Sequence, residues 1–139
     1  TNAYFGEKDF QQLQIVKKMV KKTNLKVNVI GCPIFREPNN LAMSSRNERL
    51  SPQEREEAAI IYKILNGAKE KFQTNSAHSV SEWVQKSFEN NPHFSLEYFV
   101  IADEATLLPS FRKNKNKKYR AFIAVFVNNI RLIDTISLN

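Results

Sequence analysis

The first part of the chain alternates between a helical and a strand-like pattern of apolar positions. Between residues 9 and 23, apolar side chains recur at helical spacing and are separated mostly by Gln and Lys, which predicts an amphipathic helix. Its apolar positions are Phe10, Leu13, Val16, Met19 and Val20. Residues 27–31 are rich in β-branched side chains and end in glycine, so they predict a short strand. The opening segment is therefore expected to run loop, helix, strand and loop.

This order of elements is typical of one edge of a parallel α/β sheet. A polar motif at a helix start, a strand and a second polar loop place a binding site outside the carboxyl ends of parallel strands. These few elements do not make such a sheet by themselves. We therefore expect residues 1–50 to be the C-terminal remnant of a Rossmann-like nucleotide-binding domain, with its other strands in a missing N-terminal half. The unpartnered helix face and strand edge also favour self-association, so a homodimer is expected.

A new region begins with a well-marked helix start at Ser51. This serine is expected to be the N-cap, Pro52 the first helical residue, and Glu54 the partner that completes a capping box. A domain boundary near residue 50 follows. One helical face is predicted from the apolar residues Ala58, Ile61, Tyr62, Leu65, Ala68 and Phe72.

The rest of the chain predicts one more helix and a small sheet. The second helix is expected to open at Ser79 with Glu82 and to end before Pro92. Strands are predicted at residues 95–102, 120–127 and 130–138. Asn128-Asn129 suits a two-residue hairpin between the last two strands, because asparagine tolerates positive φ. The predicted fold class is α/β, a Rossmann-like remnant (1–50) followed by a small α+β lid domain (51–139) of two helices on a three-stranded, mainly antiparallel sheet.

Composition places the chain among ordinary globular proteins. Hydrophobic residues make up 42% of the 139 residues and charged residues 25%, and no apolar run approaches the ~18 residues that span a bilayer. No targeting segment is visible. Cys32 is the only cysteine, which excludes an intrachain disulfide framework and a cysteine-based zinc site. These features favour a cytoplasmic location without membrane attachment.

The net charge of +7 raises the alternative of a basic RNA-binding module. The charge is clustered on the polar side of the helix at 9–23 and in the segment 112–120. No aromatic residue interrupts the lysine-rich run 113–118, so this run lacks the stacking platforms of single-strand binders. We interpret both clusters as solvated surface and expect no specific nucleic-acid partner.

Two short polar stretches carry the candidate chemistry. Residues 5–12, FGEKDFQQ, combine a glycine, a lysine, carboxylates and amides, and residues 41–47, LAMSSRN, place two hydroxyls beside an arginine. These groups bind phosphate and ribose, and together they indicate a nucleotide site. Taken singly, each stretch is more often a capped helix start or a polar turn than a binding site.

The two stretches resemble motifs of the pantothenate synthetase (pantoate–β-alanine ligase) family. The first is similar to its FGEKD(F/Y)QQL signature, and the second to its LA(L/M)SSRN version of the KMSKS phosphate loop of class I nucleotidyl transferases. Arg36-Glu37 and the segment 131–134, RLID, also fit the family in order. The family begins with a half that carries a His-x-Gly-His motif, whereas His78 and His93 stand in unrelated contexts. We therefore expect this chain to be the C-terminal portion of a longer enzyme.

The resemblance implies a two-step, ATP-dependent ligation. Pantoate attacks the α-phosphate to form pantoyl adenylate and pyrophosphate, and β-alanine then displaces AMP. The implied ATP-binding residues are Gly6, Glu7, Lys8, Asp9, Phe35, Met43, Ser44, Ser45 and Arg46, of which Lys8, Ser44, Ser45 and Arg46 are the implied catalytic residues. Lys8 would be a phosphate cation and Asp9 a ribose ligand, Gln12 would contact pantoate, and the backbone of Phe35 would face adenine. Arg46 is the implied group for transition-state charge, because its planar fork binds two oxygens.

Three further expectations complete the interpretation. The sequence holds no cluster of metal ligands, so Mg²⁺ is expected to arrive bound to ATP. Asn39-Asn40 replaces the family's usual Asp-Gly, and asparagine enters left-handed conformations less freely than glycine. The chain by itself is expected to be inactive. Alternatives that remain open are another class I nucleotidyl transferase or synthetase, the RNA-binding module, and a non-catalytic association domain.

Overall fold

The computed structural model describes residues 1–139 and contains two compact units, Thr1–Phe35 and Arg36–Asn139. The sequence predicted a domain boundary near residue 50, whereas the two compact units meet between Phe35 and Arg36. The physical reason is hydrophobic: Leu41 and Leu50 are buried in the core of the second unit and bring residues 36–50 with them. None of the helices combines the length and the apolar composition needed to cross a lipid bilayer.

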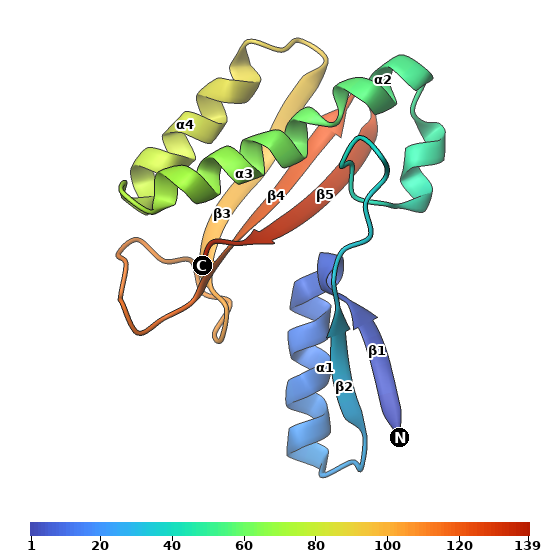
Figure 1. Ribbon diagram of the computed structural model, residues 1–139, viewed down its shortest axis with the longest axis vertical. Coiled ribbons are helices and arrows are strands. Elements are labelled where there is room, and N and C mark those ends of the chain that lie inside the picture. The colour runs from blue at the N-terminus through green and yellow to red at the C-terminus, as the bar shows by residue number, and fades with distance from the viewer. The chain divides into compact units, whose positions relative to one another are not determined.

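The first unit is a β-α-β arrangement (Figure 1). Its elements are β1 (Asn2–Gly6), the 3-10 turn η1 (Glu7–Asp9), α1 (Phe10–Thr23) and β2 (Asn28–Cys32). The two strands are parallel, with Gly6 opposite Cys32. The prediction of an opening loop was wrong, because the backbone groups of β1 are paired with a strand that lies far along the sequence. The helix and the second strand are confirmed.

Close packing joins α1 to β2. Phe10 and Leu13 are the buried residues of the helix, and Gly31 of β2 lies directly beneath it. A Cβ atom at Gly31 would stand 2.9 Å from Leu13 Cδ2, so only glycine fits this approach without a shift. The helix ends at Asn24, which adopts the left-handed conformation (φ 54°) and donates its N–H to the backbone oxygen of Val20.

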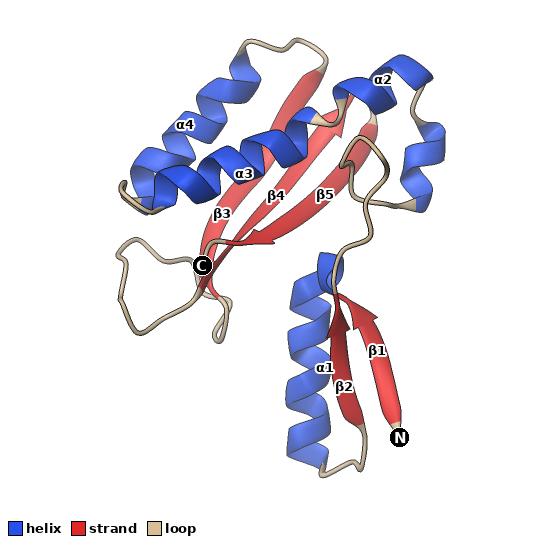
Figure 2. Ribbon diagram, viewed as in Figure 1, coloured by secondary structure: helices blue, strands red, loops and turns tan.

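The second unit packs helices on an antiparallel sheet (Figure 2). Its elements are η2 (Ser45–Arg49), α2 (Pro52–Glu57), α3 (Ile60–Phe72), α4 (Ala77–Glu89), β3 (Phe94–Asp103), β4 (Tyr119–Val127) and β5 (Ile130–Ser137). The strand order is β3-β4-β5. Helix α4 packs on β3 and α3 on β5. The predicted fold class, with two main helices on a three-stranded antiparallel sheet, is confirmed.

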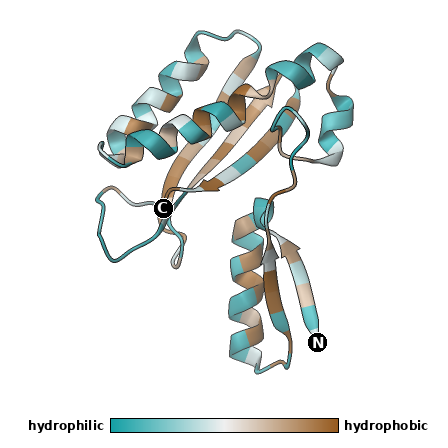
Figure 3. Ribbon diagram, in the orientation of Figure 1, coloured by the Kyte–Doolittle hydropathy of each residue, from teal (hydrophilic) through white to brown (hydrophobic).

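The core of this unit lies between the two long helices and the sheet. Its most buried side chains come from α3, α4 and β4: Ile61, Leu65, Val80, Val84, Ile123 and Val125. Figure 3 shows the apolar character of β4, which is buried along nearly its whole length as the central strand. Burial on this scale makes the sheet a rigid support for the loops attached to it.

The helix boundaries partly differ from the predictions. The capping box at Ser51 is present, but the helix that starts there ends at Glu57 with Ala58 as its C-cap. After it, the Ala59 N–H bonds to the Glu56 oxygen with 3-10 spacing. Helix α4 opens with Ser76 as N-cap rather than Ser79, because the Ser76 hydroxyl accepts the Ser79 N–H. The hairpin between β4 and β5 is confirmed, with φ 54° at Asn128.

Candidate functional site

The first polar motif lies at the carboxyl edge of the parallel strand pair. Strand β1 ends at Gly6, the turn Glu7–Asp9 follows it, and α1 begins directly afterwards. Strand β2 ends at Cys32, opposite Gly6, and leads to Phe35. Because parallel strands share one carboxyl edge, both segments lie beyond the same edge of the sheet. The first motif therefore lies at the edge of the sheet where the sequence predicted it.

Several residues of this motif are exposed, namely Gly6, Asp9, Gln12 and Phe35. A Cβ atom at Gly6 would meet no atom within 4 Å, and its φ of −71° is an ordinary one, so neither packing nor backbone conformation requires glycine there. Asp9 occupies the N-cap position of α1 yet makes no capping hydrogen bond with its side chain. Gln12 is exposed on the first turn of α1 and Phe35 is 72% exposed, whereas Lys8 is half-buried.

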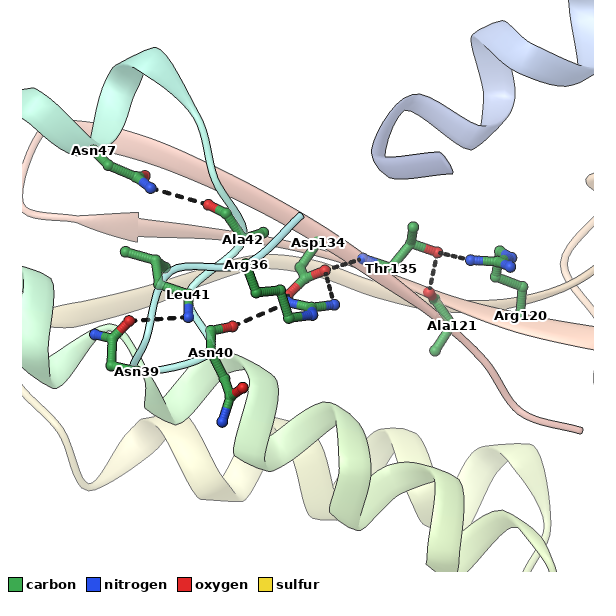
Figure 4. Close-up of polar contacts among 10 residues, drawn as sticks. All are labelled: Arg36, Asn39, Asn40, Leu41, Ala42, Asn47, Arg120, Ala121, Asp134 and Thr135. Atoms are coloured by element: carbon green, nitrogen blue, oxygen red, sulfur yellow. Dashed lines mark hydrogen bonds and ion pairs between the residues drawn. The ribbon is translucent and has the colours of Figure 1, made fainter. Parts of the chain in front are cut away.

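The second motif begins with a tight turn in the other unit (Figure 4). Arg36 and Ala42 form an antiparallel bridge, and the Asn40 N–H donates to the Glu37 backbone oxygen at 2.8 Å across the turn. Asn40 has φ 73°, so asparagine does take the left-handed conformation here. The Asn39 side chain braces the turn, because its Nδ2 donates to the backbone oxygen of Arg55 at 2.8 Å. The turn is therefore tied to helix α2.

The loop that follows this turn, residues 43–46, is anchored on both sides and exposed in the middle. The buried anchors are Leu41 and Ala42 before it and Asn47 after it. The exposed members are Met43, Ser45 and Arg46. Ser44 caps η2 by accepting the Arg46 N–H at 3.2 Å, and Arg46 Nη1 donates to the backbone oxygen of Arg131 at 3.3 Å. We call residues 43–46 the anchored loop.

Asn47 provides the anchor after the loop. Its side chain is 1% exposed, and its Nδ2 donates to the Ala42 backbone oxygen at 3.0 Å and to Glu37 Oε2 at 2.9 Å. Its Oδ1 is buried without a protein partner. Sequence reasoning included Asn47 in the motif but assigned it no role. The structure shows that it ties the two ends of the anchored loop to the preceding turn.

An ion pair joins the same turn to the sheet. Arg36 binds Asp134 of β5 through two hydrogen bonds, Nη1 to Oδ2 at 2.7 Å and Nη2 to Oδ1 at 2.9 Å. Arg36 also donates to the Asn40 backbone oxygen at 3.1 Å and stacks on the Tyr62 ring, 3.9 Å from its centroid. Arg36 and Asp134 are 98 positions apart, so no local pattern could indicate the pair. Both had been noted only as parts of the family resemblance.

Next to the loop, Arg131 is the charged residue whose pKa is shifted. Arg131, whose backbone oxygen accepts from Arg46, is itself paired with Glu97 at 2.6 Å, and this hydrogen bond raises the pKa of Arg131. No group of three or more His, Cys, Asp or Glu side chains is placed to hold a metal ion. His78 lies apart from the loop on α4, exposed and paired with Glu82 at 3.2 Å.

The candidate residues thus fall into two groups that the structure defines separately. Gly6, Glu7, Lys8, Asp9, Gln12 and Phe35 belong to the carboxyl edge of the first unit, and Met43, Ser44, Ser45 and Arg46 belong to the anchored loop of the second. Residues that sequence reasoning left without a role are Arg36, Asn47 and Asp134. Arg36 bonds to Asp134 and bridges Ala42, and Asn47 bonds to the Ala42 backbone oxygen next to the loop.

Comparison with known proteins identifies relatives of high sequence identity. The chain is 64% identical over 138 residues to the pantothenate synthetase of Flavobacterium psychrophilum, and 57% identical over 137 residues to that of Christiangramia forsetii. It covers 49% and 48% of these proteins, so the chain spans about half the length of the curated relatives it matches.

Solved structures agree with the sequence relatives. Pantothenate synthetase from Thermus thermophilus matches with a TM-score of 0.87 and 36% identity over 99% of this chain and 49% of its own. The ligase from Francisella tularensis, solved with β-γ ATP and β-alanine, matches with a TM-score of 0.65 and 29% identity over 99% of this chain and 43% of its own. The model of the pantoate-β-alanine ligase family matches residues 1–137. The chain therefore belongs to the pantoate–β-alanine ligase family.

Proposed function

We propose that this chain supplies the C-terminal half of the active site of an ATP-dependent ligase that joins pantoate to β-alanine through a pantoyl adenylate. The observation that carries the proposal is the anchored loop, which presents two hydroxyl-bearing residues and Arg46 between buried supports in a chain of this family. The Francisella relative was solved with β-γ ATP and β-alanine, which supports ATP and β-alanine as substrates.

In the first step, a pantoate carboxylate oxygen attacks the α-phosphorus of ATP, and the bond to pyrophosphate breaks. Negative charge grows on the phosphoryl oxygens and on the leaving group, so catalysis requires positioned cations and hydrogen-bond donors. Arg46 is exposed and held by one long hydrogen bond, which leaves most of its guanidinium for oxygens of the phosphate. The Ser44 oxygen accepts the Arg46 N–H, so its own proton remains available for donation.

In the second step, the amine of β-alanine attacks the carbonyl carbon of pantoyl adenylate, and AMP leaves. The groups at the carboxyl edge of the first unit would hold the nucleotide throughout. Asp9 would accept hydrogen bonds from the ribose hydroxyls, Lys8 would bind phosphate, and the open backbone at Gly6 would let the nucleotide approach. Gln12 would bind pantoate, and the backbone of Phe35 would face adenine. Mg²⁺ would enter as the counter-ion of the ATP polyphosphate.

The remaining half of the ligase is the partner that this proposal requires. The first unit exposes large apolar residues on its sheet and on α1: Tyr4 at 65%, Ile15 at 63%, Met19 at 50% and Ile30 at 37%. A two-stranded sheet is too small to be stable without further cover. An N-terminal half with the other strands would bury these residues and complete a nucleotide-binding domain. Self-association through the same surfaces is the alternative in the absence of that half.

The experiment joins this chain to the N-terminal half of the Flavobacterium psychrophilum relative, as a fusion and by co-expression. Pantoate-dependent exchange of pyrophosphate into ATP is then measured. We expect exchange from the joined halves and no pantothenate from the chain alone, because Lys8 and Arg46 would lack a fixed substrate. The Lys8→Ala variant controls for contaminating host enzyme. Turnover by the chain alone, or exchange that does not depend on pantoate, would contradict the proposal.

A further inference from the structure

One arginine lies within the anchored loop and another precedes it, and their surroundings differ. Arg46 lies within the loop, is exposed, and makes one hydrogen bond of 3.3 Å to a backbone oxygen. Arg36 lies before the loop, and its side chain is only 16% exposed. A phosphate group approaching the loop therefore has access to one guanidinium and little access to the other.

The guanidinium of Arg36 is already committed to protein partners. Both of its terminal nitrogens bond to Asp134, one of them also bonds to the Asn40 backbone oxygen, and one face is covered by the Tyr62 ring. Asp134 is 3% exposed, and its Oδ1 also accepts the N–H of Thr135 at 2.8 Å. The carboxylate neutralises the arginine in a partly buried, bidentate pair, and bidentate pairing is the strongest geometry for an arginine and a carboxylate. Arg36 thus has no comparable capacity left for a phosphate.

The position of this pair links the loop to the sheet. Arg36 bridges to Ala42, the residue immediately before the loop, and Asp134 stands in the middle of β5, opposite Ile123 of β4. On the other side of the loop, Asn47 bonds to the Ala42 oxygen. Ala42 is therefore held by two residues: Arg36 pairs with it in the antiparallel bridge, and Asn47 donates to its backbone oxygen (Figure 4).

We propose that Arg36 and Asp134 form a bracket that positions the anchored loop to receive the ATP polyphosphate, and that Arg36 is a positioning residue rather than a phosphate ligand. The inference rests on the proposed function for the identity of the ligand. The bracket transfers the rigidity of the sheet to the exposed loop, so the phosphate-binding groups do not have to be ordered when ATP binds.

The bracket and the ligand hypotheses predict opposite results for one variant. If Arg36 bound phosphate, Asp134→Asn would release it from its partner, and ATP affinity would stay the same or rise. If the two residues form a bracket, Asp134→Asn lowers the rate of adenylate formation as much as Arg36→Lys does. The rate of adenylate formation in the double variant then falls no further than in either single variant, because both substitutions break the same ion pair.

The first measurement uses the 139-residue chain without any assay of activity. Hydrogen exchange of residues 42–47 is compared in the parent chain, Arg36→Lys and Asp134→Asn, with thermal unfolding to confirm that each variant folds. The matched control is Glu97→Gln, which breaks the Arg131 ion pair at the surface of the same sheet. We expect at least about tenfold faster exchange of residues 42–47 in both bracket variants and no change in the control. Unchanged exchange in folded bracket variants would overturn the proposal.

The second measurement uses the joined halves described above. We expect kcat for adenylate formation to fall on the order of 10- to 100-fold in Arg36→Lys and Asp134→Asn, with KM for pantoate unchanged. Additive losses in the double variant, or unaltered activity in Asp134→Asn, would show that Arg36 acts alone and would overturn the bracket. Failure of the parent fusion to turn over would instead contradict the proposed function, and the exchange result on the chain would still decide the inference.

Discussion

Replacing Arg46 with alanine separates a functional role from a structural one. The side chain is exposed and makes one hydrogen bond, of 3.3 Å, to a backbone oxygen. Exposed substitutions of this kind change the free energy of unfolding by no more than about 0.5 kcal/mol. The loop stays anchored in the variant, because Ser44 caps η2 through a backbone N–H and Asn47 remains buried. Arg46→Ala should therefore fold as well as the parent.

The effect on catalysis should be far larger. Loss of one positioned donor to a developing oxyanion slows a reaction by about 100- to 1000-fold. A hundredfold loss corresponds to about 2.7 kcal/mol of transition-state stabilisation, several times the expected change in folding stability. Such a difference cannot come from partial unfolding of the variant.

The assay is single-turnover formation of pantoyl adenylate by the joined halves, with urea unfolding of the chain measured in parallel. Arg49→Ala is the matched control, because Arg49 is an exposed arginine of the same 3-10 turn whose side chain forms no hydrogen bond or ion pair. We expect Arg49→Ala to retain the parent rate. A near-normal rate for Arg46→Ala, or equal losses in both variants, would refute the assignment of Arg46 to transition-state charge.

Two further predictions concern stability. Gly31→Ala should destabilise the first unit by about 1–3 kcal/mol in urea unfolding, because the new methyl group would press on the buried Leu13. Gly6→Ala is the control and should leave the stability unchanged, because a Cβ atom there would meet nothing within 4 Å. Equal stabilities of the Gly31→Ala variant and the parent would contradict the packing of α1 on Gly31. Hydrogen bonds, chiefly from the Ala105 N–H, hold the pKa of Asp103 below its ordinary 3.8 in the folded protein. The Asp103 carboxylate therefore contributes its full share to the free energy of unfolding above pH 3.8, and this share is lost as the pH falls through the lower pKa of the folded state. The free energy of unfolding is measured by urea unfolding at steps of roughly half a pH unit between about pH 2 and 5. Acid should lower it less in Asp103→Asn than in the parent, and an identical loss in both would exclude a stabilising role of the Asp103 carboxylate.

Short-range patterns were sufficient to predict most elements of the second unit. The Ser51 capping box, the β4–β5 hairpin and the strand alternation depend on residues within a few positions of one another. Such signals are present in any window of sequence, because hydrogen-bond geometry and side-chain direction repeat with the backbone. The start of α4 was predicted three residues too late, because the Ser76 hydroxyl rather than the Ser79 hydroxyl caps the helix.

The motif stretches by themselves also predicted which side chains would bind a nucleotide. The anchored loop exposes the Ser45 hydroxyl and the Arg46 guanidinium as a phosphate site requires, and the first motif lies at a carboxyl strand edge. Assigning their partners and chemistry depended on family resemblance, because a polar turn and a phosphate loop have the same composition.

Only the tertiary structure decided the long-range relations. Strand β1 is short, and its pairing becomes visible only when β2 lies beside it in parallel register. The bond between Arg36 and Asp134 joins residues 98 positions apart, and it places the turn before the anchored loop with the second unit rather than the first. The physical reason is that local periodicity specifies what an element is, whereas the burial of apolar faces and the pairing of buried charges specify which elements meet.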